Sequence, residues 1–264
     1  MRPYSAVATL WFLTATVARA IENPGASLPA CADWGDSFGD VLAEVFEQVK
    51  DRSGYGIAFR NRLRLDYLPD EEYASWPGSG SSPALAVYVN SPHNASHRPR
   101  IRIGRALKRI ACSRDEIAFV IAHEMAHLGD RQDRFYRFQL GRFWRWFRRE
   151  YRDHRERDPA AYERLREAML RERGEVFTKC LERAADLRGR EIMERADFNR
   201  DAAPAFFEHM EDWIEALGLG HEDETHGSLE ERIEQVEEEE PEWPRALRPC
   251  RRLLLKESPE EQGG

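Results

Sequence analysis

Hydrophobic positions follow two different periods in the first half of the chain, and each period predicts a different element. Over residues 37–49 the apolar side chains recur every three or four positions, which is the spacing of one buried face of an α-helix. Over residues 56–68 they alternate with polar ones, which predicts a strand. Short apolar runs at 84–89 and 101–103 predict two further strands on either side of a polar stretch, 90–99. We therefore expect a small sheet after the first helix.

The second half of the chain has a mostly helical pattern. Ser113 followed by Glu116 forms a capping box directly before the apolar run 117–122, so a buried helix is expected to begin there. The glycine-containing stretch 218–227 interrupts the pattern, and a run of glutamates opens an acidic tail at 237–264. The predicted fold class is α+β, mainly helical, with a small β-sheet beside the helix that begins at Ser113.

Composition narrows the class of protein. Of 264 residues, 41% are hydrophobic and 33% are charged, which is typical of a soluble globular chain rather than of a disordered or polytopic membrane protein. The formal net charge of -8 argues against a general nucleic-acid binder, because such proteins need a basic footprint. Residues 21–264 are long enough for one large domain, and a single domain is predicted.

Residues 1–20 have the pattern of an export signal. Arg2 precedes an apolar run at 6–17, which is followed by Ala18-Arg19-Ala20. Export signals usually have small residues at the third and first positions before the cleavage site, so cleavage is expected after Ala20. The predicted location of the mature chain is the periplasm, with a membrane-associated state as the alternative.

Four cysteines fit an exported protein. They are even in number, widely spaced and free of any CxxC pair: Cys31, Cys112, Cys180 and Cys250. This pattern favours two structural disulfides in an oxidising compartment over a thiolate metal site. Three pairings are compatible with four cysteines, and the spacing does not choose among them.

The predicted buried helix carries an HExxH sequence, with His123, Glu124 and His127 at its defined positions. Residues four apart lie about one turn apart on the same helix face, so both imidazoles can bind one metal ion. Glu124 can then reach the water bound to that ion. This is the chemistry of a zinc hydrolase.

A catalytic zinc needs a third protein ligand. A metzincin would have Gly at 130 and His at 133, whereas both positions are Asp here, so that class is excluded. Downstream, Glu182 and Asp186 lie one helical turn apart, and the small Gly189 would allow close helix packing. Alone, this segment would fit a charged surface helix. Beside an HExxH it predicts a ligand, Glu182, and a partner for the outer N–H of a zinc-bound histidine, Asp186.

These motifs carry a resemblance to a known family. The HExxH and the ExxAD at 182–186 are accompanied by Asn94-Ala95 upstream, and by His226 and Arg232 downstream. Over about residues 84–236 the chain resembles the M48 family of zinc metallopeptidases, whose members usually have His-Pro where this chain has His226-Gly227. Because no run of transmembrane helices or helical repeats follows the motif, the resemblance is to exported soluble members with a lone catalytic domain.

The resemblance implies a gluzincin-like zinc metalloprotease domain with one zinc ion per chain. By resemblance, His123, His127 and Glu182 hold the zinc and Glu124 is the general base. The resemblance also assigns roles near the substrate to four further residues: His226 as a catalytic residue, and Asn94, Ala95 and Arg232 as substrate-binding residues.

These expectations together predict an endopeptidase of the cell envelope. An extended peptide can pair with the strand at 84–89, which would suit unfolded or misfolded protein substrates. The alternative is a non-catalytic, zinc-bound chaperone or binding protein on the same scaffold, against which the intact Glu124 argues.

The segment 131–157 is basic in an otherwise acidic chain. Its ten arginines face four acids, and on a helix the aromatic side chains cover one half and most arginines the other, with Gly141 as a weak point midway. Three interpretations stay open: contact with an anionic membrane surface, a lid over the zinc cleft, or a core helix whose arginines pair with the acidic remainder.

Overall fold

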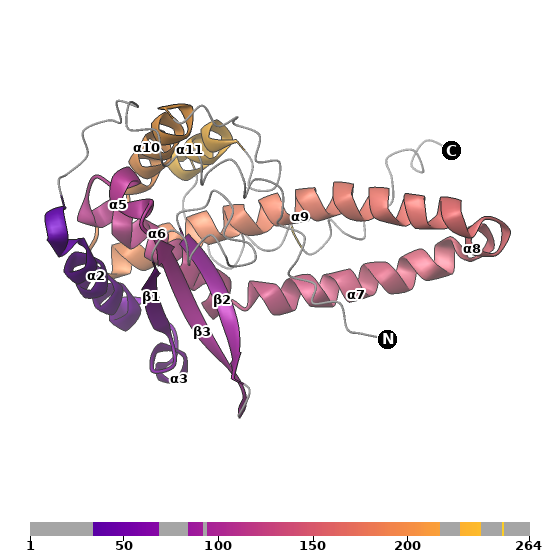
Figure 1. Cartoon of the computed structure of the whole chain (residues 1–264), viewed down its shortest axis with the longest axis horizontal. Coiled ribbons are helices and arrows are strands. Elements are labelled where there is room, and N and C mark those ends of the chain that lie inside the picture. The colour runs from indigo at the N-terminus through magenta and orange to yellow at the C-terminus, as the bar shows by residue number, and fades with distance from the viewer. Residues whose placement is uncertain (1–33, 69–83, 92–93, 217–227, 239–249, 251–264) are drawn as a thin grey trace.

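The computed structural model describes residues 34–68, 84–91, 94–216, 228–238 and 250. The predicted signal at 1–20, His226 and nearly all of the predicted tail lie outside these residues. Within them the protein is mainly helical with one small sheet, as the coarse fold class predicted (Figure 1). No helix among the described residues is both long and apolar enough to cross a membrane.

The first helix and the sheet form one side of the main body. Helix α2 (Phe38–Arg52) buries the apolar stripe predicted from the sequence. The sheet has the order β1-β3-β2, in which β1 (Arg64–Leu68) runs parallel to β3 (Asn94–Gly104). Strand β2 (Ala84–Ser91) is antiparallel to β3 and forms an edge of this sheet. The buried Ile101 and Ile103 of β3 anchor the sheet in the main core.

All three strand predictions were wrong in their bounds. Within 56–68 only the last five residues form a strand, because Ile57–Arg60 forms the short helix α3 instead. A short 3-10 helix, η1 (Gly35–Ser37), precedes α2. The polar stretch 90–99 is not a spacer, since β2 and β3 continue into it and Ser91 pairs with Asn94. Backbone ladder bonds need no apolar side chains, so this extension was invisible to the hydrophobic pattern.

Helix α6 (Arg114–Gly129) lies at the centre of the body and begins at the predicted capping box. The backbone N–H of Glu116 donates to Ser113 Oγ at 3.2 Å, and the Glu116 carboxylate accepts from the N–H of Cys112 at 2.9 Å. Every residue from Glu116 to Ala126 is buried. The short helix α5 (Leu107–Ile110), which the sequence pattern did not predict, leads into it.

Helix α9 (Pro159–Arg195) crosses α6 in the body and continues far outside it (Figure 1). It begins at Asp158, whose carboxylate accepts from the N–H of Ala161 at 2.9 Å. Helices α10 (Ala202–Ala216) and α11 (Leu229–Glu238) pack against each other, and α10 covers α6 with Phe206 and Phe207. The core therefore has α6 at its centre.

A helical hairpin projects from the body, and we call it the arm (Figure 1). It consists of α7 (Gln132–Glu150), α8 (Arg152–Arg157) at its far end, and the first half of α9 returning beside α7. Helix α7 runs unbroken through Gly141, the predicted weak point, and the chain bends at Tyr151 instead. Phe143 and Phe147 are buried against Tyr162 of α9, so the arm has its own small aromatic core.

One disulfide is fully described. Cys180 on α9 is bonded to Cys250, with a Cα–Cα distance of 5.6 Å, and Cys112 is also disulfide-bonded. Cys31 lies outside the described residues. The three described cysteines are thus all in disulfides, as predicted from the number and spacing of the cysteines.

Candidate metal centre

Three predicted ligands meet between α6 and α9. The Nε2 atoms of His123 and His127 are 3.1 Å apart, because residues four apart share a face of α6. Glu182 approaches from α9. Its Oε2 lies 3.3 Å from His123 Nε2, and its Oε1 lies 3.4 Å from His127 Nε2. Two nitrogens and a carboxylate therefore face one point, and the group can hold a metal ion.

The spacing of the donor atoms fits a small tetrahedral ion. Bonds of about 2.0–2.1 Å at tetrahedral angles place neighbouring donors about 3.3–3.4 Å apart. The observed separations of 3.1–3.4 Å are close to that value without any movement of the helices. Three protein donors leave one tetrahedral position for a water or a substrate oxygen.

Asp186 holds the ring of His123 on the side away from the metal position. Its Oδ1 lies 2.8 Å from His123 Nδ1, so that the ring N–H donates outward and Nε2 is turned toward the metal position. Arg232 of α11 donates to both oxygens of Asp186, from Nε at 2.9 Å and from a terminal nitrogen at 2.6 Å. The guanidinium carbon of Arg232 also stands 4.4 Å from the ring centroid of Phe207. This buried chain of contacts holds α6, α9 and α11 in one arrangement.

Burial and pairing set the charges of Asp186 and His123. Burial alone would raise the pKa of Asp186, but the Arg232 charge and the hydrogen bond from His123 hold it below its ordinary value. Burial would lower the pKa of His123, whereas hydrogen bonds to Asp186 and Glu182 raise it to about 10. Without an ion, a proton on His123 thus balances the carboxylates. A metal ion bound at Nε2 would replace that proton, so binding is coupled to proton release.

The second histidine is oriented by a residue that sequence reasoning missed. His127 Nδ1 lies 2.7 Å from the side-chain oxygen of Gln132, which is buried at 2% exposure. Because an amide oxygen only accepts, His127 carries its proton on Nδ1 and leaves Nε2 free for a metal. The turn depends on Arg131, whose φ of 54° lies in the left-handed region and folds Gln132 back over the end of α6. The sequence pattern did not indicate the break between α6 and α7, and without that break Gln132 could not be placed beside His127.

Glu124 is 7% exposed on the same helix as both histidines. A carboxylate in the buried middle of an apolar helix is costly, which is a reason to look for a chemical role. Its position within the HExxH places it one residue beyond His123 on α6. The general-base role assigned to it stays a prediction.

The remaining predicted site residues have different outcomes. Asn94 and Ala95 begin β3 at its hairpin with β2, where only the backbone is described. Arg232, predicted to bind substrate, lies behind the metal ligands, paired with Asp186 and 4.0 Å from Glu182. His226 lies outside the described residues. Their predicted contacts with substrate stay predictions.

A second group of possible ligands has a structural explanation. Cys112, Glu116 and His209 lie within reach of one ion, and His209 Nδ1 is 2.9 Å from a Glu116 oxygen. However, Cys112 is disulfide-bonded, and a disulfide sulfur is not a thiolate ligand. Glu116 already caps α6. We therefore assign this group to the attachment of α10 at the start of α6.

Comparison of the chain with family models, curated proteins and solved structures found no match. The function proposed below therefore depends on the geometry of His123, His127, Glu182 and their supporting residues.

Proposed function

We propose that this chain is a zinc-dependent endopeptidase that resembles the M48 family in its site. The observation that supports the proposal is the convergence of His123 Nε2, His127 Nε2 and the Glu182 carboxylate at 3.1–3.4 Å. Two imidazoles and one carboxylate with an open fourth position are the ligand set of catalytic zinc in gluzincin-like hydrolases. Softer thiolate sites and all-oxygen magnesium or calcium sites need other donors.

In the proposed reaction, each residue of the site has a separate task. A zinc ion held by His123, His127 and Glu182 would lower the pKa of a water molecule to about 7 and polarise the scissile carbonyl. Glu124 would accept a proton from the attacking water and deliver it to the leaving amine. Asp186 and Gln132 hold the two imidazoles in the tautomer that leaves Nε2 for the metal. Arg232 keeps Asp186 ionised and in place.

The proposed substrates are extended segments of unfolded or misfolded proteins. Strand β2 is an edge of the sheet and packs beside α6, the helix that carries both histidines. An edge strand offers unpaired backbone groups, so a substrate can bind there through its main chain with little sequence preference. Such binding requires an unfolded substrate segment.

The proposed place of action is the cell envelope. The Cys180–Cys250 disulfide and the disulfide of Cys112 fit an oxidising compartment. The signal-like residues 1–20 would direct the chain there, with cleavage after Ala20. Purified mature protein should therefore begin at Ile21, as mass spectrometry of its N-terminus would reveal.

The deciding experiment compares hydrolysis and metal content in the same preparations. The chain should cleave a chemically unfolded protein, lose this activity with a chelator and regain it with zinc. Glu124→Gln should retain the metal and lose about 10²- to 10⁴-fold in rate, because it removes the base and preserves size. The exposed Glu167→Gln, on the arm, is the matched control and should leave the rate unchanged.

Two results would contradict the proposal. Full turnover in Glu124→Gln would remove the assigned base. Stoichiometric zinc in a wild-type protein that never cleaves an unfolded substrate would favour the alternative, a non-catalytic binding protein.

A further inference from the structure

The arm is positively charged at its end, although the whole chain carries a net charge of -8. From residue 142 to 157 the sequence has seven arginines and three acidic residues. All seven arginine side chains are exposed: Arg142, Arg145, Arg148, Arg149, Arg152, Arg155 and Arg157. Within the part of the chain that the structure describes, none of them forms an ion pair. Ion pairs between these arginines and acidic residues of the described body, which the third sequence interpretation expected, are therefore absent at this end of the arm.

The aromatic face of α7 is already occupied. Phe143 and Phe147 are fully buried, and the rings of Phe147 and Tyr162 lie 5.1 Å apart across the hairpin. Trp146 is covered by Arg173 of α9, whose guanidinium carbon lies 5.0 Å from the ring centroid. The buried side of α7 therefore cannot insert into a membrane or close over the metal centre while the arm keeps this packing.

The opposite side of α7 forms a continuous basic stripe. At about 100° per residue, Arg142, Arg145, Arg148 and Arg149 fall within an arc of about 120°. The same arc contains Phe138, a large hydrophobic side chain that is 59% exposed. An exposed aromatic ring among arginines that form no ion pair with the described residues is a combination that needs an explanation beyond solubility.

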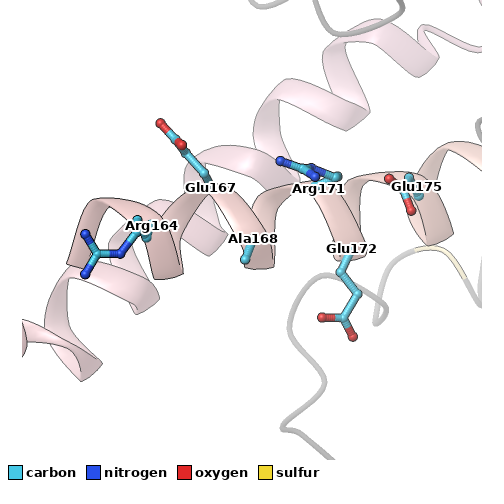
Figure 2. Close-up of a pocket in the computed structure, with 6 residues that line it drawn as sticks. All are labelled: Arg164, Glu167, Ala168, Arg171, Glu172 and Glu175. Atoms are coloured by element: carbon cyan, nitrogen blue, oxygen red, sulfur yellow. The ribbon is translucent and has the colours of Figure 1, made fainter. Parts of the chain in front are cut away.

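The other helix of the arm does not share this charge. Between residues 159 and 178, α9 has four arginines and four glutamates. Figure 2 shows side chains of both charges along one face of α9, where a hollow is lined by Arg164, Glu167, Ala168, Arg171, Glu172 and Glu175. The basic surface of the arm is thus limited to α7 and α8.

The basic surface on α7 and α8 lies far enough from the acidic body to be screened from its negative charge. Helix α7 has 19 residues, so it carries α8 about 28 Å along its axis, away from the body (Figure 1). That length exceeds the Debye length of about 8 Å at physiological ionic strength. The negative charge of the body is therefore screened at α8, and the arm can approach an anionic surface first.

We propose that the outer face of α7 together with α8 binds the surface of an anionic phospholipid membrane. Guanidinium groups pair well with lipid phosphates, and an exposed ring such as Phe138 can enter the headgroup region. A convex arm end suits a broad surface better than it suits a groove. Nucleic acid would also pair with the arginines and its bases can stack on an aromatic ring, so binding to DNA is measured as the competing outcome.

Vesicle partitioning tests this directly with the full chain. The wild type should bind vesicles that contain phosphatidylglycerol, fail to bind vesicles of phosphatidylcholine alone, and dissociate in high salt. A triple variant, Arg145→Gln with Arg149→Gln and Arg152→Gln, should bind about 100-fold more weakly, since each basic residue near an anionic surface adds about a factor of five. These side chains are exposed and form no ion pair with the described residues, so the melting temperature should not change.

A matched triple variant separates location from net charge. Arg62→Gln with Arg98→Gln and Arg109→Gln removes the same charge from exposed positions on the body and should bind as the wild type does. Equal losses in both triple variants, or no binding by the wild type to phosphatidylglycerol vesicles, would overturn the proposal. Tighter binding to duplex DNA or polyglutamate than to these vesicles would also overturn it and assign the arm to that other partner. Neither triple variant changes a residue of the metal centre, so the outcome is independent of the proposed proteolysis.

Discussion

Gly189 on α9 lies directly against the backbone of His123 on α6. A Cβ at position 189 would stand 3.1 Å from the amide nitrogen of His123 and 3.2 Å from its Cα. This close approach lets α9 bring Glu182, two turns earlier, up to the two imidazoles. The absence of a side chain at 189 is therefore a condition for the metal centre.

Gly189→Ala should separate the helices slightly and weaken the site. We expect a loss of about 1–3 kcal/mol in stability, because backbone atoms of α6 must move, and a lower metal affinity. Gly174→Ala on the same helix is the control, since a Cβ there meets nothing within 4 Å. That control should be neutral or more stable by about 0.5–1 kcal/mol. Thermal unfolding and competitive metal titration measure both effects, and equal behaviour of the two variants would contradict the close-packing argument.

Asp186→Asn should weaken metal binding without removing it. The substitution retains the shape but not the charge that stabilises the His123 N–H, so affinity should fall about 10- to 100-fold. Glu182→Ala and the double variant His123→Ala, His127→Ala should instead lose the metal. Metal content after dialysis, together with competition against a chelator of known affinity, distinguishes weakened metal binding from lost metal binding. Stoichiometric metal in the double variant would refute the centre.

Gln132→Met should also weaken metal binding, by about 10-fold, because the Nδ1–H of His127 loses its acceptor. Gln139→Met makes the same change on the same helix, at a side chain that is also buried. It should leave metal affinity unchanged. If both variants bind metal equally well, Gln132 has only a packing role.

Asp130 should make stability depend on pH. Burial raises its pKa to about 6, more than the nearby Arg188 lowers it. Between about pH 4 and 6 the unfolded chain has therefore released a proton that the folded chain retains, so wild-type stability falls as pH rises through this window. Asp130→Asn removes this dependence. It should be more stable than the wild type by about 1–3 kcal/mol above pH 6, with the difference vanishing near pH 4. Denaturant unfolding at both pH values measures it, and a difference that grows toward low pH would show that the sign is wrong.

The sequence determined the parts of this protein that depend on near neighbours in the chain. The stripe of α2, the capping box at Ser113 and the pairing of His123 with His127 all arise from residues three or four positions apart. Helix geometry converts such spacing into a shared face, so a pattern is sufficient. The use of Cys112, Cys180 and Cys250 in disulfides followed from the number and context of the cysteines in the same way.

Tertiary structure decided which distant residues meet. Only the crossing of α6 and α9 sets Glu182 at 3.3 Å from His123, and only α11 brings Arg232 to Asp186. The role of Gln132 needed the left-handed turn at Arg131, which ends one helix and starts the next. The aromatic stripe of α7 could equally have faced lipid, a cleft or a core, because amphipathicity specifies that a face is covered but not by what. The return of α9 beside α7 covers that face, and it leaves the arginines outside.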